Sequence, residues 1–478
     1  MTSRTVLIPE WVLTGDGVVR TGCAVVVEDE KITAIVSADE TVADAIRIQL
    51  PRHLLMPGLA NLHTHVGAGP IARAISEDYS IPAGMPFYVP LSQLWKHAYS
   101  DELRDQYRSV VQWDLLAMMR TGTTTVVNHA STDAEGYFDI ALKSGVRTFA
   151  GPTVPLNVTH RLGRLQDGHA HRRDLAALDS QIDELADMRK LFAQWNGRDG
   201  RISVLLGPAA VHAVEPTVLE SVAKLADEFD CLVTTHLCQA PSELSETNRR
   251  YGLTPLRVLD RMGLTNHRLL AAHGTYLPDA DLELAADSGM TLVHCASRKA
   301  KEAMISPSVR FRDAGITVGL GTDGFSCDMV EELKFAAILG KIGTAATDRP
   351  TAFETVRVAT SGAAKSLGRS DLGSIQVGAT ADLIAIDLSG PVTGPVFDPL
   401  QTLVYYGNGR DVAFSMIGGR IIMQHGRFTG ADLDSVRRAA QDALAGIWEH
   451  AVREGLIAEA LPSAVGRPVR GVPTCLTC

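Results

Sequence analysis

Short apolar segments alternate with amphipathic ones through the middle of the chain. Segments such as 123–130 and 231–239 are β-branched and apolar at successive positions, which is typical of strands buried on both faces of a parallel sheet. Between them, segments such as 216–230 repeat apolar residues every three to four positions, as a helix packed on a sheet does. We predict strands at 59–65, 123–130, 146–154, 201–211, 231–239, 267–277, 290–298 and 316–324. About eight strand–helix units in a row predict an α/β fold, the closed (β/α)8 TIM barrel.

The two ends of the chain carry a different pattern. Residues 4–50 contain period-2 segments, among them 23–36, and residues 373–430 contain further short apolar segments separated by glycine or charged turns. Both ends therefore predict short antiparallel strands, which we expect to pair into one small β-sandwich. The predicted domains are a composite β-sandwich (1–57 plus 373–430), the barrel (58–372), and a C-terminal helix and tail (431–478).

Composition and charge narrow the classes of partner. The chain has 478 residues, of which 45% are hydrophobic and 21% charged, as in an ordinary globular protein. The net charge of −10 disfavours a nucleic-acid partner, which would need a basic field. No apolar run approaches the roughly 20 residues of a membrane helix, and the N-terminus lacks the apolar stretch of a secretory signal. We expect a cytoplasmic protein with a small-molecule substrate and no membrane partner.

Cysteine usage adds little chemistry. The 7 cysteines are spread over a long chain, so a disulfide framework is not expected. Cys475 and Cys478 form a C-x-x-C pair at the extreme tail, without a second pair nearby. This pair is either a redox or metal element or part of an inert tail, and we expect the inert tail.

The strongest local signal is the pair His63 and His65. Residues two apart on a strand point to the same face, so both imidazoles face one way. At the carboxyl end of a first barrel strand they would point into the mouth, where active sites of this fold form. Alone, an H-x-H sequence can still be a chance pair.

Three more residues of similar chemistry follow other predicted strands. His236, His273 and Asp323 each lie at the carboxyl end of a strand. Imidazole nitrogens and a carboxylate are suitable ligands for Zn²⁺, Fe²⁺ or Co²⁺. A buried core histidine explains any one of these residues, but not five at matching strand ends. The pattern predicts a divalent metal site.

Several motifs together resemble the amidohydrolase superfamily. These are MPGLANLHTH, TTHLCQ, AAHG, GLGTDG and GSIQVGATADLIAIDL, and the similarity runs from about residue 5 to 430. They look most like the triazine, purine and adenosylhomocysteine aminohydrolases, and the phenylurea and thiocarbamate hydrolases offer a second precedent. The resemblance implies a homo-oligomer and one metal ion, zinc with iron or cobalt as the alternatives. It also implies four metal ligands, namely His63, His65, His236 and Asp323.

The resemblance further implies one ion rather than two and a set of catalytic roles. Two-metal members bridge their ions with a modified lysine or a glutamate on a middle strand, and 202–206 contains neither. The ion would lower the pKa of its bound water, and Asp323 would accept the proton and return it to the leaving nitrogen. His273 would contact the water or the developing oxyanion.

Gln239 departs from the pattern of the deaminating relatives. They carry a glutamate three residues after the ligand histidine, where this chain has an amide that cannot act as a general acid. One reading is hydrolysis of an amide, urea or carbamate C–N bond in a small aromatic or heterocyclic substrate. The alternative is an aminohydrolase, a deaminase or dechlorinase of a purine, pterin or s-triazine ring, in which Gln239 orients the ring. A non-catalytic binding barrel is the third reading.

Other candidate residues would line a substrate pocket. Arg298 and Lys299 either meet an acidic group of the ligand or are solvated charges on a loop. His129 and His212 are either structural or substrate contacts. The predicted substrate-binding residues are Trp95, Phe87, His294, Ser297 and Cys327.

Overall fold

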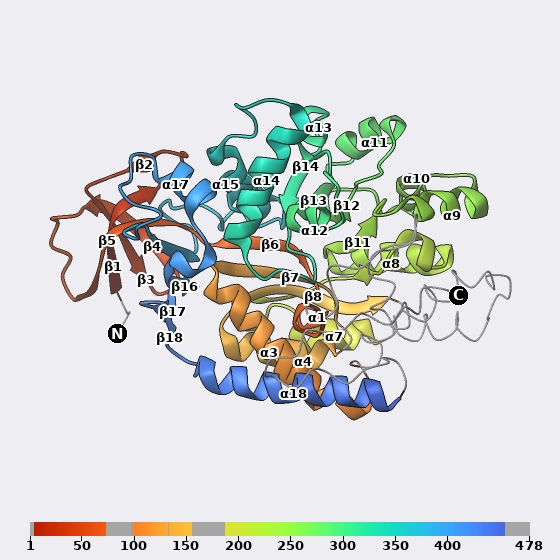
Figure 1. Cartoon of the computed structure of the whole chain (residues 1–478), viewed down its shortest axis with the longest axis horizontal. Coiled ribbons are helices and arrows are strands. Elements are labelled where there is room, and N and C mark those ends of the chain that lie inside the picture. The colour runs from red at the N-terminus through yellow and green to blue at the C-terminus, as the bar shows by residue number, and fades with distance from the viewer. Residues whose placement is uncertain (1–3, 73–97, 99, 132, 155–186, 455–478) are drawn as a thin grey trace.

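The computed structural model describes residues 4–72, 98, 100–131, 133–154 and 187–454 (Figure 1). Phe87, Trp95 and the cysteine pair Cys475 and Cys478 lie outside the described residues, so the roles expected of them remain predictions. None of the helices in the described part is long and apolar enough to cross a membrane.

The central unit is the predicted parallel barrel. Its strands are β6 (Leu59–Thr64), β7 (Thr123–Ser131), β8 (Arg147–Val154), β9 (Ile202–Val204) with β10 (Gly207–Pro208), β11 (Val233–Leu237), β12 (Leu269–His273), β13 (Thr291–His294) and β14 (Thr317–Leu320). Neighbouring strands pair in parallel, from β6 through β10 and from β11 through β14. Isolated parallel bridges join Leu206 to Val233 and Thr64 to Asp323, which closes the ring.

Several predicted strands extend past the observed ones: those predicted over 267–277 and 316–324 end at His273 and Leu320, and two others differ for reasons that the contacts show. The segment predicted as one strand over 201–211 forms β9 and β10, because the chain changes partner: Leu205 N–H donates to Ala150 and Leu206 N–H to Leu232. The segment predicted over 290–298 stops at His294, and α12 (Ala296–Lys301) follows. The chain becomes helical after His294 because the buried carboxylate of Glu332 accepts the N–H group of Ser297 in the first turn of α12.

Helices cover the outside of the barrel (Figure 1). The predicted helix 216–230 is α8 (Pro216–Phe229), which buries its apolar stripe, including Val218 and Val222. The others are α1 (Ala68–Ala72), α3 (Arg104–Arg120), α4 (Ala134–Ser144), α7 (Met188–Trp195), α9 (Pro241–Tyr251), α10 (Pro255–Arg261), α11 (Leu282–Asp287), α13 (Ser308–Asp313), α14 (Met329–Thr344), α15 (Ala352–Ala359) and α16 (Ser361–Ser366). The C-terminal α18 (Leu433–Arg453) runs beneath α3 and α4.

The two ends of the chain share one sheet, as the period-2 segments predict. The N-terminal strands are β1 (Arg4–Leu13), β2 (Val19–Arg20), β3 (Cys23–Glu28), β4 (Lys31–Ser37) and β5 (Ala45–Pro57). The C-terminal strands are β15 (Leu383–Asp387), β16 (Val412–Ile417), β17 (Arg420–Gln424) and β18 (Arg427–Phe428), with α17 (Pro399–Tyr406) between β15 and β16. In the described residues the sheet has nine strands, and β5 pairs with β15 where the two sets meet.

This sheet folds over its own core at one end of the barrel (Figure 1). Leu7 and Val25 from the N-terminal strands pack in one buried cluster with Leu383, Phe414 and Met416 from the C-terminal strands. The expectation that all these strands run antiparallel was wrong for one pair, because β1 and β5 are parallel. The long connection through β3 and β4 allows that crossover.

Candidate metal centre

His63 and His65 come from β6, where the two-residue spacing puts both rings on one face. Their ring centroids lie 5.0 Å apart. His63 is fully buried, and neither of its ring nitrogens has a hydrogen-bond partner among the described residues. A buried nitrogen with a lone pair and no partner is costly, unless it ligates an ion.

His65 and His236 are each oriented by a backbone carbonyl. The Nδ1 of His65 lies 3.1 Å from the His129 carbonyl oxygen, and the Nδ1 of His236 contacts the Ala209 carbonyl. A carbonyl only accepts, so each Nδ1 carries the proton and each Nε2 keeps its lone pair. The two Nε2 atoms lie 3.2 Å apart, which brings two acceptors together as a metal site does.

Asp323 lies on the loop after β14. Its Oδ1 is 3.5 Å from His65 Nε2, and its Oδ2 is 3.8 Å from His273 Nε2. The loop is held against β6, since Asp323 N–H donates to the His63 carbonyl at 2.9 Å. Gly321 permits this approach: a Cβ there would come within 2.7 Å of the His63 carbonyl oxygen. Asp323 itself has a φ of 57°, in the left-handed region that few non-glycine residues adopt.

Two overlapping groups of residues could hold an ion. One consists of His63, His65 and His236, and the other of His63, His273 and Asp323. Within each group the ligand atoms all lie within 4.8 Å of one another. The structure thus brings together the four residues expected as ligands and His273, and a set of imidazoles with one carboxylate suits a divalent transition metal.

His129 belongs to this cluster, although its position along the chain is equally typical of a structural histidine. It lies near the carboxyl end of β7, and its ring centroid lies 4.5 Å from that of His236 and 5.4 Å from that of His63. Its ring is buried, and neither ring nitrogen has a hydrogen-bond partner in the described residues. Its place at a strand end, shared with the other histidines, was the signal available.

Burial keeps these imidazoles neutral. It lowers the pKa of His63, of His129 and of His273 well below the usual value, and neighbouring imidazoles or cations lower each pKa further. Burial raises the pKa of Asp323, but Arg298 and His65 lower it by more, so this pKa lies below its ordinary value. Neutral imidazoles beside an ionised carboxylate are the protonation states that bind a metal ion.

Gln239 follows β11 and is largely buried. Its backbone N–H donates at 3.1 Å to Glu243, a buried carboxylate of α9. Burial raises the pKa of Glu243 to about 7. Glu243 thus holds the loop that carries Gln239, a role that the sequence did not suggest.

The predicted substrate-binding residues His294, Ser297 and Cys327 have different surroundings. His294 is buried, and burial followed by the charge of Lys299 lowers its pKa to about 4. The Ser297 hydroxyl donates to Glu332, which burial gives a pKa of about 8. Cys327 is half-buried after Asp323, and its carbonyl accepts from Thr121 at 2.7 Å.

Arg298 and Lys299 are not solvated loop charges. Each side chain is 1% exposed, and both lie on α12. The alternative of solvated loop charges was wrong, because the segment is helical and turns both cations inward. His212, the other histidine in doubt, is buried, and burial lowers its pKa to about 4.

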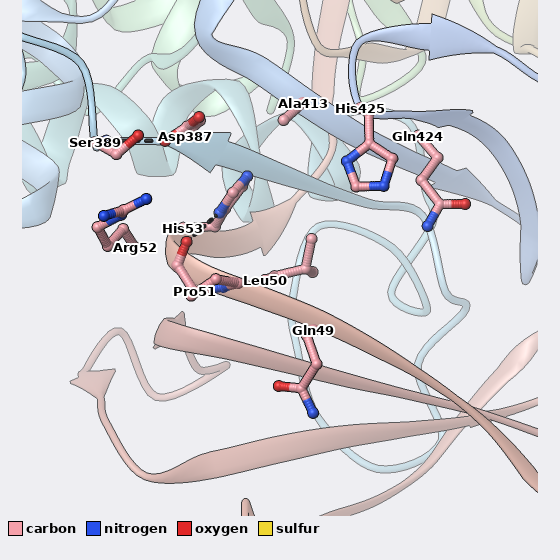
Figure 2. A pocket seen from close by; sticks show the side chains of 10 residues that line it. All are labelled: Gln49, Leu50, Pro51, Arg52, His53, Asp387, Ser389, Ala413, Gln424 and His425. Atoms are coloured by element: carbon pink, nitrogen blue, oxygen red, sulfur yellow. Dashed lines mark hydrogen bonds between the residues drawn. The ribbon is translucent and has the colours of Figure 1, made fainter.

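A hollow lies in the β-sandwich. Figure 2 shows its lining, in which His53 and Arg52 come from β5, Asp387 from β15 and His425 from the turn after β17. The His53 Nδ1 is engaged at 2.7 Å with the Pro51 carbonyl. The groups of described residues that could hold a metal all lie in the barrel, so this hollow is separate from the candidate centre.

Comparison with known proteins agrees with the fold and the cluster. The sequence model of the amidohydrolase family matches residues 54–422 of this chain. The chain is 30% identical over 393 residues to a 5-methylthioadenosine/S-adenosylhomocysteine deaminase from Pelotomaculum thermopropionicum, covering 81% of this chain and 84% of the relative. A protein of the same description from Halobacterium salinarum is 30% identical over 428 residues, covering 87% and 93%.

Two solved structures are similar over nearly the whole chain. An adenosine deaminase from Xanthomonas campestris with bound zinc has a TM-score of 0.80 at 27% identity, covering 93% of this chain and 98% of that one. An atrazine chlorohydrolase variant from Arthrobacter aurescens TC1, complexed with zinc and atraton, has a TM-score of 0.80 at 24% identity, covering 92% and 100%, a likeness of fold. The chain belongs to the amidohydrolase family, as a metal-dependent hydrolase of carbon–nitrogen bonds other than peptide bonds.

Proposed function

We propose that the chain binds one zinc ion through His63, His65, His236 and Asp323. The observation that carries this proposal is the 3.2 Å approach of the Nε2 atoms of His65 and His236, both left as acceptors by their Nδ1 contacts. The strand that holds 202–204 supplies no lysine or glutamate to bridge a second ion, which supports a single site.

The residues around the ion divide the chemical work. A divalent ion held there would supply a Lewis acid that activates water. Asp323 would accept a proton from the attacking water and deliver it to the leaving nitrogen. His273, whose Nε2 lies 3.8 Å from Asp323, donates a hydrogen bond to the oxygen that gains charge at the attacked carbon.

Gln239 is the basis for the type of C–N bond that we propose is cleaved. An amide cannot pass a proton to a ring nitrogen, and the nearby Glu243 is engaged with the loop backbone. The proposed reaction is therefore cleavage of an open amide, urea or carbamate C–N bond in a small aromatic or heterocyclic substrate. Ring deamination is the second candidate, which the deaminase relatives favour.

The test compares released products. Zinc-loaded protein is incubated with aryl ureas, anilides and carbamates, and separately with aminated purines, pterins and triazines, and both ammonia and organic amine are measured. We expect organic amine from the first set. Gln239→Ala should retain turnover, with a loss of about 10- to 100-fold, the size of a lost positioning contact.

The opposite pattern identifies the second candidate. Efficient ammonia release from a ring compound, with no turnover of the acyclic carbonyl compounds, contradicts the proposed reaction. A gain in ammonia release by Gln239→Glu would then show that the restored acid acts as proton donor.

A further inference from the structure

Two buried cations lie on α12, directly after the β13 residue His294. Arg298 and Lys299 are each 1% exposed, whereas charged side chains normally reach solvent unless a partner holds them. They follow the carboxyl end of a barrel strand, the same end that carries the candidate metal ligands. Their burial at this end requires negative charge nearby.

Arg298 stands beside the candidate ligand Asp323. Its Nε is 3.4 Å from Asp323 Oδ2, and its guanidinium carbon is 4.7 Å from the centroid of the Phe325 ring. A guanidinium stacked on a ring is fixed in plane, which suits recognition of a planar anion. Arg298 thus reaches the place where the reaction would occur.

Lys299 approaches the same place from the side of β11. Its Nζ is 3.5 Å from the Gln239 carbonyl oxygen. Lys299 therefore adds positive potential beside Gln239, which follows the carboxyl end of β11.

A single carboxylate bridges the two cations. Glu302 Oε1 is 2.8 Å from Arg298 Nη1, and Glu302 Oε2 is 2.8 Å from Lys299 Nζ. Glu302 is 13% exposed, so it is the member of this trio with most access to solvent. The arrangement shows that the pair can bind a carboxylate with one oxygen on each cation.

We propose that Arg298 and Lys299 form a subsite for a carboxylate of the substrate, which replaces Glu302 when the substrate binds. The inference rests on the proposed function and narrows its substrate to an anionic amide, urea or carbamate. Such a carboxylate would take over both contacts of Glu302 with the two cations and position the scissile carbon beside Asp323 and His273.

The test measures binding to metal-free protein, so that direct ligation of an ion cannot contribute. Isothermal titration calorimetry with benzoate and with benzamide, a neutral compound of similar size, gives the preference for the anion. We expect benzoate to bind about tenfold more tightly, the scale of a charge-assisted hydrogen bond. Arg298→Met and Lys299→Met should each lose that preference and leave benzamide binding unchanged.

Two further variants sharpen the result. Lys301→Met removes the same charge from an exposed position of α12 and should keep the preference for benzoate. Glu302→Gln removes the internal competitor and should tighten benzoate binding about tenfold, whereas a purely structural bridge predicts no gain. Thermal unfolding of each variant establishes that it is folded.

Equal binding of benzoate and benzamide by both the wild-type protein and Glu302→Gln overturns the proposal. So does a preference for benzoate that survives in both Arg298→Met and Lys299→Met. These binding measurements use no metal and no turnover, so a negative result overturns the carboxylate subsite alone. A negative result in the product assay would instead overturn the proposed reaction.

Discussion

The histidines at the mouth of the barrel differ in the partners of their Nδ1 atoms. The Nδ1 atoms of His65 and His236 donate to backbone carbonyls, so the tautomer and the orientation of these two rings are set before any ion binds. His63 has no such partner among the described residues, so ligation is the interaction that would satisfy its ring. Loss of an oriented ligand should therefore remove the site rather than weaken one contact.

We expect His236→Ala to lower the zinc content from about one equivalent per chain to below about 0.1, because three remaining ligands no longer close the site. The measurement is elemental analysis of protein purified without chelator. His212→Asn is the matched control, since His212 is buried nearby but belongs to neither candidate metal group. Wild-type zinc content in His236→Ala, or two tightly bound equivalents in the wild type, would contradict the proposed ligand set.

The convergence of the ligand residues could be predicted from the sequence, and the surroundings could not. His63 and His236 lie near the carboxyl ends of parallel strands, Asp323 follows another, and the carboxyl ends of such strands meet at one edge whatever the packing details. The burial of Arg298 depends on Asp323 and Glu302, which the fold brings to it. His129 joins the cluster in the same way, and nothing in its local sequence distinguishes it from a core histidine.

Strands and helices show the same division between local pattern and tertiary contact. Apolar periodicity located all the barrel strands, but the change of partner that divides 201–211 depends on β8 and β11 together. The start of α12 depends on Glu332 of α14, which accepts the N–H of Ser297 at 3.2 Å. Side chains distant in sequence thus decide where these elements begin and end.

One buried ion pair joins the barrel to the sandwich. Arg147, the first residue of β8, donates to Asp382 at 2.7 and 3.1 Å, and both side chains are under 5% exposed. Asp382 also accepts from Gly418 N–H at 2.7 Å, and its carbonyl accepts from Gly58 N–H. Asp382, which directly precedes β15, therefore connects the β16–β17 turn of the sandwich to the start of β6 and to β8 of the barrel.

We expect Asp382→Ala to lower the free energy of unfolding by about 3–5 kcal/mol, because it leaves the Arg147 guanidinium buried without its partner. Thermal and chemical unfolding measure the change. The double variant Arg147→Met with Asp382→Leu should recover much of the loss, since no unpaired charge remains. Asp313→Ala, at an exposed ion pair with Arg349, is the control and should change stability by less than about 1 kcal/mol. A loss of equal size in the control would show that burial of the pair is not the cause.

The molecule as a whole is organised around β5. This strand pairs with β1 in parallel and with β15 in antiparallel fashion, so it joins the two ends of the chain. It ends at Pro57, and β6 with its two histidines begins at Leu59. Leu54 and Met56 of β5 also pack in a cluster with Leu320 and Met329 of the barrel. The sandwich and the barrel therefore share contacts through which the unfolding of one removes support from the other.

This coupling predicts that the sandwich cannot be removed without the barrel. Deletion of residues 1–50 would take away β1 to β4 and the part of β5 up to Leu50, and would uncover Phe414 and Met416, which are fully buried in the intact sheet. Either set of strands alone is too small a sheet to be stable in water. We expect the truncated protein to be insoluble or to lack zinc, as measured by fractionation and elemental analysis.

A milder variant tests the same coupling in soluble protein. Leu55 is fully buried between the sheet's two strand sets, opposite Ala385, and Leu55→Ala should cost about 2–5 kcal/mol through the cavity it leaves. If the sandwich and the barrel unfold together, the loss of secondary structure and the release of zinc should move to lower temperature by the same amount, as circular dichroism and a zinc-sensitive dye followed in parallel would show. Val392→Ala, at a residue 70% exposed, should leave both transitions in place. The opposite result would be two separate transitions in Leu55→Ala, with zinc released at the wild-type temperature. It would show that the barrel is stable on its own, because destabilisation of the sandwich would then not extend past Pro57 and Leu59 into the barrel.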